Sequence, residues 1–204
     1  GHLCDYILFD SAWVGYEQFI PMMKDCSPLL LELNENDPGI FVTQSVHKQQ
    51  AGFSQASYIH KKDKHIMGQK RYLDDKRFNN SYRCHASTSP FYPLFVSLDV
   101  NARMQDGPAG RKLWDDCVKL GIEARKAIFR NCTMLKPFVP PVVNGKWWEE
   151  YDTATIAADI SFFEFIPGEK WHSFWGYGDK QYFVDPNKLM LTTPGIDIET
   201  GEYQ

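Results

Sequence analysis

The chain has 204 residues, of which 43% are hydrophobic, 15% aromatic and 24% charged, and its formal net charge at pH 7 is −4. This composition is typical of a folded protein with one core or two small domains, and it excludes a disordered chain. The negative charge gives no general reason to bind nucleic acid or an anionic membrane, and no apolar run approaches the about 20 residues that span a bilayer.

Five cysteines are scattered along the sequence, at positions 4, 26, 84, 117 and 132, and none belongs to a CxxC pair. The residues before Tyr6 contain no basic segment of the kind that opens a signal peptide. An odd, scattered set of cysteines is more typical of reduced thiols than of a disulfide framework. We therefore expect a cytoplasmic protein. We also expect the chain to be a piece of a larger protein, because no βα unit precedes its first predicted strand.

Two short apolar runs predict buried strands. The first is Tyr6–Phe9, which leads into Asp10-Ser-Ala-Trp13, and the second is Ile40–Gln44, which leads into Ser45-Val-His-Lys48. In open α/β sheets, ligands bind at the carboxyl ends of the strands. The sequence therefore predicts that neighbouring strands bring a carboxylate and an amine to one edge of a sheet.

The segments around these strands are less regular. Residues 14–28 are aromatic and bounded by proline, which predicts a short irregular helix or loop, and residues 29–33 are a candidate third strand. Residues 34–39 have the composition of a turn. Residues 49–59 are small and polar, as expected of a segment packed against a cofactor or subunit. Residues 60–77 hold seven lysines and arginines among three aspartates, which favours a solvated loop over the alternative of a phosphate- or partner-binding patch.

Two helices are predicted in the middle of the chain. Ser87-Thr-Ser-Pro90 is typical of a helix start, with a hydroxyl cap before a proline in the first turn. The apolar residues that follow at helical spacing, up to a stop at Gly107-Pro108, are Leu94, Phe95, Leu98 and Ala102. A second helix begins at Ala109, and its predicted apolar stripe is Leu113, Cys117, Leu120, Ala124 and Ile128. The charged residues expected outside that stripe are Arg111, Asp115, Lys119, Arg125 and Arg130.

A domain boundary is predicted after this long helix, where prolines stand at positions 137, 140 and 141. The expected domains are residues 1–135, including the linking helix, and residues 136–204. The second part is rich in tryptophan and glycine and contains a candidate strand at 188–193. Because aromatic clusters usually form cores, we assign its tryptophans no function.

A lysine and an aspartate at one sheet edge suit a pyridoxal phosphate site. Lys48 would form a Schiff base with the cofactor aldehyde, and proximity to the cationic ring would lower its pKa. Asp10 would keep the pyridine nitrogen protonated through a charge-assisted hydrogen bond, so that the ring can accept electrons. Without a partner, however, a single lysine is usually a surface residue and an aspartate at a strand end is usually a cap.

Other side chains in the same segments have matching chemistry. Ala12 would point the same way as Asp10 along a strand and pack on the ring, and the indole N–H of Trp13 could reach the phenolic oxygen. His47 could donate a proton or contact the substrate carboxylate. The hydroxyl groups that could bind the phosphate, two of them at the predicted helix start, belong to Ser45, Ser87 and Ser89. No metal site is predicted, because the spacing of the histidines and Cys84 does not give three ligands on one face.

Three stretches of sequence closely resemble the bacterial basic amino-acid decarboxylases, which are pyridoxal phosphate enzymes acting on ornithine, lysine or arginine. These stretches are Asp10–Trp13, Thr43–Ser57 and His85–Pro90. The resemblance covers the whole chain. Within the family, the stretches that look like the ornithine branch are Pro137–Gly145, Gly176–Asp179, Val184–Lys188 and Leu191–Gly195.

The resemblance implies an α/β fold: part of an aspartate-aminotransferase-like (fold type I) large domain that binds pyridoxal phosphate, followed by the start of a smaller α+β domain. It implies that Lys48 is the Schiff-base lysine, Asp10 the pyridine partner and Ser45 a phosphate ligand. It places Ala12 against the ring and Trp13 at the phenolic oxygen. Ser87 would bind the phosphate from the neighbouring subunit of a homodimer.

The implied reaction is the decarboxylation of L-ornithine to putrescine and carbon dioxide, with lysine or arginine as the alternative substrate. Relative to the family, the sequence lacks the ring-stacking histidine and the main phosphate loop. A hypothesis of another class is therefore that the chain by itself is a non-catalytic fragment, at most an assembly unit.

Overall fold

The computed structural model describes residues 3–194. The chain divides into two compact units, Gly1–Arg111 and Lys112–Gln204. The division falls inside a long helix, α4 (Gly107–Asn131), whereas the sequence predicted a domain boundary at the prolines that follow this helix. Gly195 of the last ornithine-like stretch lies outside the described residues.

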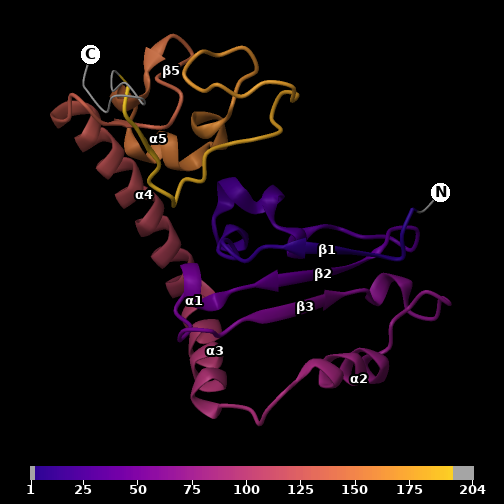
Figure 1. Ribbon diagram of the computed structural model, residues 1–204. Coiled ribbons are helices and arrows are strands. Elements are labelled where there is room, and N and C mark those ends of the chain that lie inside the picture. Colours follow the sequence, from indigo (N-terminus) through magenta and orange to yellow (C-terminus); the bar gives the residue numbers. More distant parts are fainter. Residues whose placement is uncertain (1–2, 195–204) are drawn as a thin grey trace, which may run out of the picture. The chain divides into compact units, whose positions relative to one another are not determined.

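The first unit is built on a sheet of three strands in the order β1-β2-β3 (Figure 1). The strands are β1 (Tyr6–Asp10), β2 (Gly39–Gln44) and β3 (Tyr58–Lys62). β1 and β2 are parallel, and β3 runs antiparallel to β2. Both strands predicted from the apolar runs are therefore confirmed, but only β2 is buried as predicted. The prediction that β1 is buried is wrong, because β1 is at the edge of this sheet and its Ile7 and Leu8 are 39% and 63% exposed. A Cβ atom on Gly39 would lie 2.3 Å from the ring of Tyr6, so a glycine is needed where β2 begins beside β1.

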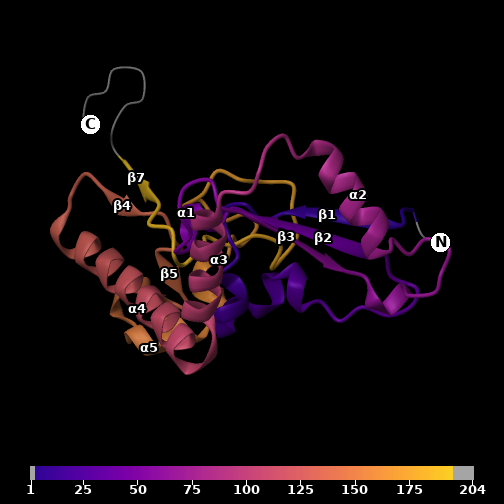
Figure 2. The same ribbon diagram turned by 90° about the horizontal axis from the view of Figure 1, so that it is seen from below.

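The two faces of this sheet are covered differently, as Figure 2 shows: α2 (Asp75–His85) lies on one side and three short 3-10 helices lie on the other. These 3-10 helices are η1 (Glu17–Phe19), η2 (Pro21–Cys26) and η3 (Pro28–Leu30). The core of the unit includes Tyr16, Ile20, Met23, Ile40 and Val42, all buried. The irregular structure predicted for residues 14–28 is confirmed. The candidate strand at 29–33 is wrong, because Pro28 fixes the backbone in the first turn of η3 instead.

The solvated loop predicted for residues 60–77 is wrong for much of its length. This segment contains the end of β3, the 3-10 helix η4 (Lys64–Ile66) and the start of α2 (Asp75–His85). Lys61 and Lys62 belong to β3, and their ammonium groups reach polar partners at the sheet edge: Asp63 and Asp75 for Lys61, and the carbonyls of Leu29 and Leu31 for Lys62. The side chain of Asp74 caps α2 by accepting from the backbone N–H of Arg77 at 2.9 Å.

Helix α3 (Tyr92–Gln105) confirms the predicted helix, but its start and its buried face differ from the prediction. Its N-cap is Phe91, with no side-chain hydrogen bond, and the proline of the first turn is Pro93, so Ser87-Thr-Ser-Pro90 is not a helix start. The helix ends before Asp106, and Gly107-Pro108 opens α4. The buried residues of α3 are all polar, namely Ser97, Asn101 and Gln105, whereas Phe95 and Ala102 of the predicted apolar face are exposed.

In the second unit, α4 packs against a region of short elements and loops. These elements are β4 (Lys136–Pro137), β5 (Val142–Val143), β6 (Lys146–Trp147), η5 (Trp148–Glu150), α5 (Thr153–Ala158), η6 (Ile160–Phe163) and β7 (Leu191–Thr192). β7 pairs with β4, which confirms a short strand within the predicted range 188–193. Trp148 is fully buried and packs against Phe163 and Phe129, with its indole N–H donating to the carbonyl of Phe162 at 2.9 Å.

The face that α4 buries was predicted wrongly. The buried residues are Trp114, Val118, Ile122, Arg125 and Lys126, whereas Leu113, Cys117 and Leu120 of the predicted stripe are exposed. Arg125, expected in solvent, is fully buried beside the ring of Phe163. Its guanidinium donates to the carbonyls of Pro186, Lys188 and Asp185 at 2.8, 2.6 and 3.3 Å. These hydrogen bonds attach the turn at 185–188 to the helix.

Candidate functional site

The carboxyl ends of β1 and β2 lie side by side, as the sequence predicted. Asp10 stands opposite Thr43 in the parallel register, and the backbone N–H of Ser11 donates to the carbonyl of Thr43 at 2.9 Å. Beyond this point β1 leads into the turn that contains Ala12 and Trp13, and β2 leads into α1 (Val46–Gln49). The sheet therefore delivers both candidate segments to one edge.

Asp10 is exposed at this edge, and its carboxylate is oriented by two hydrogen bonds. Its Oδ1 atom accepts from the backbone N–H of Ala12 at 3.1 Å and from the hydroxyl of Thr43 at 3.4 Å. Both bonds use the same oxygen, so Oδ2 remains available to a donor such as a protonated ring nitrogen. The strand ends at Asp10, and the prediction that Ala12 continues the strand alternation is wrong because Ala12 lies in the turn.

Lys48 and Trp13 are brought together by the two segments. The ammonium nitrogen of Lys48 lies 4.7 Å from the centre of the Trp13 ring, within the range of a cation–π interaction. Lys48 is exposed, and among residues 3–194 it has no ion-pair partner. Its amine is therefore near an aromatic ring and open to a ligand.

Ser45 and His47 flank this lysine on α1. Ser45 is the N-cap residue, but its side chain makes no capping hydrogen bond, so its hydroxyl is free of that role. The Nδ1 atom of His47 lies 3.0 Å from the carbonyl oxygen of Ala56. Since a carbonyl only accepts, Nδ1 carries the hydrogen and Nε2 is the atom left to exchange a proton with a ligand.

Ser87 is not brought to this edge. It is exposed in the segment between α2 and α3, and in the described part of the chain no hydrogen bond joins it to Ser45, His47 or Lys48. Ser89 lies in the same segment, before α3 begins. Neither serine is at the start of a helix, so the expectation that a helix N-terminus supports their hydroxyls is wrong.

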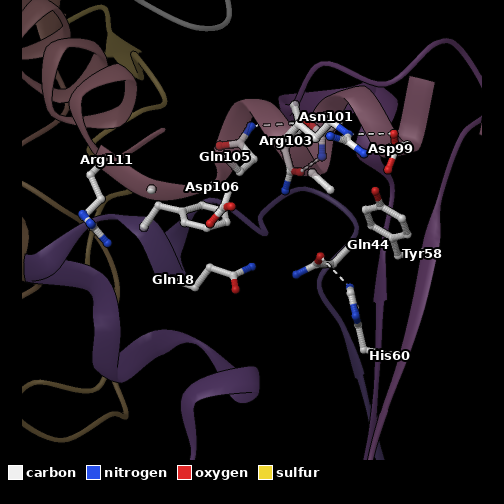
Figure 3. Close-up of a pocket in the computed structure, with 14 residues that line it drawn as sticks. Gln18, Gln44, Tyr58, His60, Asp99, Asn101, Arg103, Gln105, Asp106 and Arg111 are labelled. Atoms are coloured by element: carbon white, nitrogen blue, oxygen red, sulfur yellow. Dashed lines mark hydrogen bonds and ion pairs between the residues drawn. The ribbon is translucent and has the colours of Figure 1, made fainter. Parts of the chain in front are cut away.

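Sequence reasoning missed a polar cavity that lies beside α1 and within the first unit. It has a volume of about 750 Å³, and Figure 3 shows amide side chains on several sides of it, from Gln18, Gln44, Asn101 and Gln105. His60 Nε2 lies 3.0 Å from the amide oxygen of Gln44, and burial lowers the pKa of His60. The signal that could have revealed the α3 side of this cavity is the four-residue spacing of Asn101 and Gln105, which places two amide side chains on one face of a helix.

Three other findings concern the described residues. Among them, no group of three His, Cys, Asp or Glu side chains is arranged to hold a metal ion. None of the helices described for residues 3–194 is both long and apolar enough to cross a membrane. No disulfide joins any of the cysteines within residues 3–194.

The chain is similar to known decarboxylases along its whole length. The family model described as "Orn/Lys/Arg decarboxylase, major domain" matches residues 1–204. An ornithine decarboxylase of Haemophilus influenzae is 70% identical over 204 residues, which are 100% of this chain and 28% of that protein. The lysine decarboxylase LdcA of Pseudomonas aeruginosa is 33% identical over 201 residues, which are 96% of this chain and 25% of that protein.

Among solved structures, the constitutive lysine decarboxylase of E. coli superposes with a TM-score of 0.73 at 30% identity, covering 98% of this chain and 26% of that one. The chain therefore spans little more than a quarter of the length of the relatives it matches.

Proposed function

The chain belongs to the Orn/Lys/Arg decarboxylase family, and from this premise we propose that the whole protein decarboxylates L-ornithine to putrescine and carbon dioxide. The observation that carries this choice of substrate is the much higher identity to an ornithine decarboxylase than to a lysine decarboxylase. The family depends on pyridoxal phosphate, and the residues at the edge of β1 and β2 have chemistry that fits this cofactor.

Lys48 and Asp10 are the residues that would hold the reactive parts of the cofactor. Lys48 has an exposed amine that forms no ion pair with a carboxylate among the described residues. An amine that bonds to an aldehyde must be accessible in this way. Asp10 offers a carboxylate whose second oxygen is available to a ring N–H. When bound, pyridoxal phosphate supplies an electron-accepting ring that stabilises the charge left when the carboxylate of the substrate departs.

Four neighbouring side chains would complete the site on this chain. Trp13 would meet the phenolic oxygen through its indole N–H, and the methyl group of Ala12 would lie against the ring. Ser45 would bind the phosphate, since its hydroxyl is not used as a helix cap. His47 would carry the proton that replaces the carboxylate on the substrate carbon, because its Nε2 is the nitrogen that Ala56 does not engage.

The phosphate site also requires Ser87, which we propose comes from the neighbouring subunit of a homodimer. The support for this proposal is that Ser87 is exposed and makes no hydrogen bond with the Lys48 segment of its own chain. Mixing Ser87→Ala and Lys48→Ala proteins tests it. If the serine acts across the interface, one of the two sites in each mixed dimer has both Lys48 and Ser87, so decarboxylase activity should recover to about half per mixed dimer. No recovery of activity would exclude that arrangement.

The substrate is tested by measuring kcat/KM of the full-length protein with ornithine, lysine and arginine. Lysine carries one more methylene than ornithine, and a pocket discriminates one methylene by about 10- to 200-fold. We expect ornithine to be preferred by a factor in that range. A preference for lysine or arginine would overturn the choice of substrate while leaving the family intact.

The alternative, that residues 1–204 alone form a non-catalytic unit, is tested on the isolated 204-residue chain. If borohydride fixes pyridoxal phosphate to Lys48 in the full-length protein but not in this chain, the cofactor site needs walls from elsewhere in the protein. Equal labelling in both would show that the edge of β1 and β2 is sufficient.

A further inference from the structure

Helix α3 buries polar residues and exposes apolar ones, which is the reverse of an ordinary amphipathic helix. Asn101 is only 2% exposed, and Ser97 and Gln105 are also buried, whereas Val96, Val100 and Met104 are exposed. A buried amide or hydroxyl is unfavourable unless it is hydrogen-bonded. The partners of these three residues therefore show what the helix holds in place.

The partners belong to the segment that directly follows Lys48. The amide oxygen of Asn101 accepts from the backbone N–H of Ala51 at 3.0 Å, and its amide nitrogen donates to the side-chain oxygen of Gln50 at 2.9 Å. The hydroxyl of Ser97 accepts from the backbone N–H of Phe53 at 3.1 Å. Gln105 donates to the same oxygen of Asn101 at 3.3 Å, a bond drawn in Figure 3.

Helix α1 needs such external support because it is a single turn of four residues. One turn is too short to be stable by itself, since few backbone hydrogen bonds offset the entropy of fixing it. Its other attachments include the end of β2, the fully buried side chain of Val46, and two contacts between His47 and the carbonyl of Ala56. Figures 1 and 2 both show α1 beside α3, which supplies the remaining attachment.

We propose that Asn101, assisted by Ser97, is a positioning residue that holds the backbone after Lys48 and thereby fixes the Lys48 amine relative to Asp10 and Trp13. Asn101 is suited to this role because it is both an acceptor for a backbone N–H and a donor to a side chain on the same segment. This inference rests on the proposed function of Lys48. Without Asn101, the N–H of Ala51 loses its partner and α1 can shift, and a misplacement of about 1 Å lowers a rate by about 10²-fold.

The test compares three variants of the full-length protein with ornithine as substrate. Asn101→Leu has a similar shape but no polar atoms. Asn101→Asp keeps the acceptor for Ala51, and the Gln50 amide can turn to donate to it. Val100→Ala is the matched control, because Val100 is exposed on the same helix. We expect kcat of Asn101→Leu to fall by about 10²-fold with KM within about 3-fold, whereas Asn101→Asp recovers most of kcat and Val100→Ala is unchanged.

Hydrogen exchange of the cofactor-free protein gives a second readout that does not depend on activity. In Asn101→Leu, the amides of Ala51 and its neighbours should exchange faster while the amides of β1 and β2 do not change. A folded Asn101→Leu with normal kcat and normal exchange at Ala51 would overturn the positioning role. Loss of kcat only in proportion to the amount of unfolded protein would overturn it as well.

A further pair of measurements keeps the test decisive. If Asn101→Leu does not fold, Ser97→Ala replaces it, with faster exchange at Phe53 and a fall in kcat of about 10-fold expected for one lost hydrogen bond. Unchanged kcat and exchange in Ser97→Ala would count against the proposal. If borohydride fixes no pyridoxal phosphate to Lys48 in the unaltered protein, the proposed function fails. If Lys48 is labelled and Asn101→Leu keeps normal kcat and normal exchange at Ala51, only the positioning role is contradicted.

Discussion

Replacing Arg125 by methionine should destabilise the second unit strongly. Methionine keeps the apolar stem of the side chain but removes the guanidinium, which donates to the carbonyls of Pro186 and Lys188 at 2.8 and 2.6 Å. A hydrogen bond from a charged donor contributes about 1.5–3 kcal/mol, so the loss of these two predicts a decrease of about 3–6 kcal/mol in the free energy of unfolding. Burial lowers the pKa of Arg125 to about 10, which shows that desolvation of the guanidinium offsets part of the stability that its hydrogen bonds contribute. We therefore expect a decrease near the lower end of this range, about 3 kcal/mol.

Urea unfolding followed by tryptophan fluorescence measures this change, because most of the tryptophans lie in the second unit. With a slope of about 2 kcal/mol per M, a loss of 3 kcal/mol lowers the midpoint by about 1.5 M. Arg130→Met is the matched control, since Arg130 is exposed on the same helix, and it should change stability by less than about 0.5 kcal/mol.

The effect of Arg125→Met should also be independent of pH between about 6 and 9. Burial lowers the pKa of Arg125 in the folded protein to about 10, and its pKa in the unfolded chain is higher still, so the side chain is charged in both states over this range. Only above the folded pKa would the unfolded chain bind more protons, and stability from this group would then rise with pH. If Arg125→Met and Arg130→Met unfold at the same urea concentration, the guanidinium does not hold the turn at 185–188.

Three further predictions concern other residues. Asp10→Asn in the full-length protein should lower the rate of ornithine decarboxylation by about 10³-fold, which corresponds to about 4 kcal/mol in the barrier. Borohydride should still fix the cofactor to Lys48 in this variant. Near-normal turnover would show that Asp10 is not the pyridine partner. Trp148→Phe should lower the free energy of unfolding by about 1–2 kcal/mol, because the hydrogen bond to the carbonyl of Phe162 is lost. Trp147 is 55% exposed, so the control Trp147→Phe should have little effect. Equal urea midpoints for the two variants would refute the role of the indole N–H. Burial lowers the pKa of His60, so the stability that the neutral imidazole contributes is complete above the ordinary pKa of about 6.5 and is lost as the pH falls through the lowered pKa. His60→Gln should therefore lose less stability between pH 7 and 5 than the unaltered chain or the control His85→Gln. Equal losses in all three proteins would contradict this prediction.

The sequence predicted the parts of the fold that depend on local patterns. Continuous apolar runs before turn-forming residues identified β1 and β2, and their carboxyl ends then placed Asp10 and Lys48 at one edge. The same patterns failed to predict a strand that contains charged residues. β3 was missed because Lys61 and Lys62 look solvated in sequence, although their ammonium groups reach carboxylates and carbonyls at the sheet edge.

Helix faces were harder to predict than helices. Both α3 and α4 carry apolar residues on more than one face, and spacing alone does not show which face is covered. On α4 the covered face holds Trp114, Val118 and Ile122, and it also buries Arg125, whose partners lie about 60 residues away in sequence. On α3 the covered face is polar because its partners are backbone N–H groups of the Lys48 segment, which no pattern within the helix reveals.

The most direct test of the proposed site is to locate the cofactor on the full-length protein. Pyridoxal phosphate is added, the bound form is reduced with borohydride, and the modified peptide is identified by mass spectrometry. We predict that the added mass lies on Lys48, whose amine stands beside Trp13 at the edge that also carries Asp10. Modification of other lysines, such as Lys24 or Lys62, with none at Lys48 would contradict the assignment of the active site to this edge.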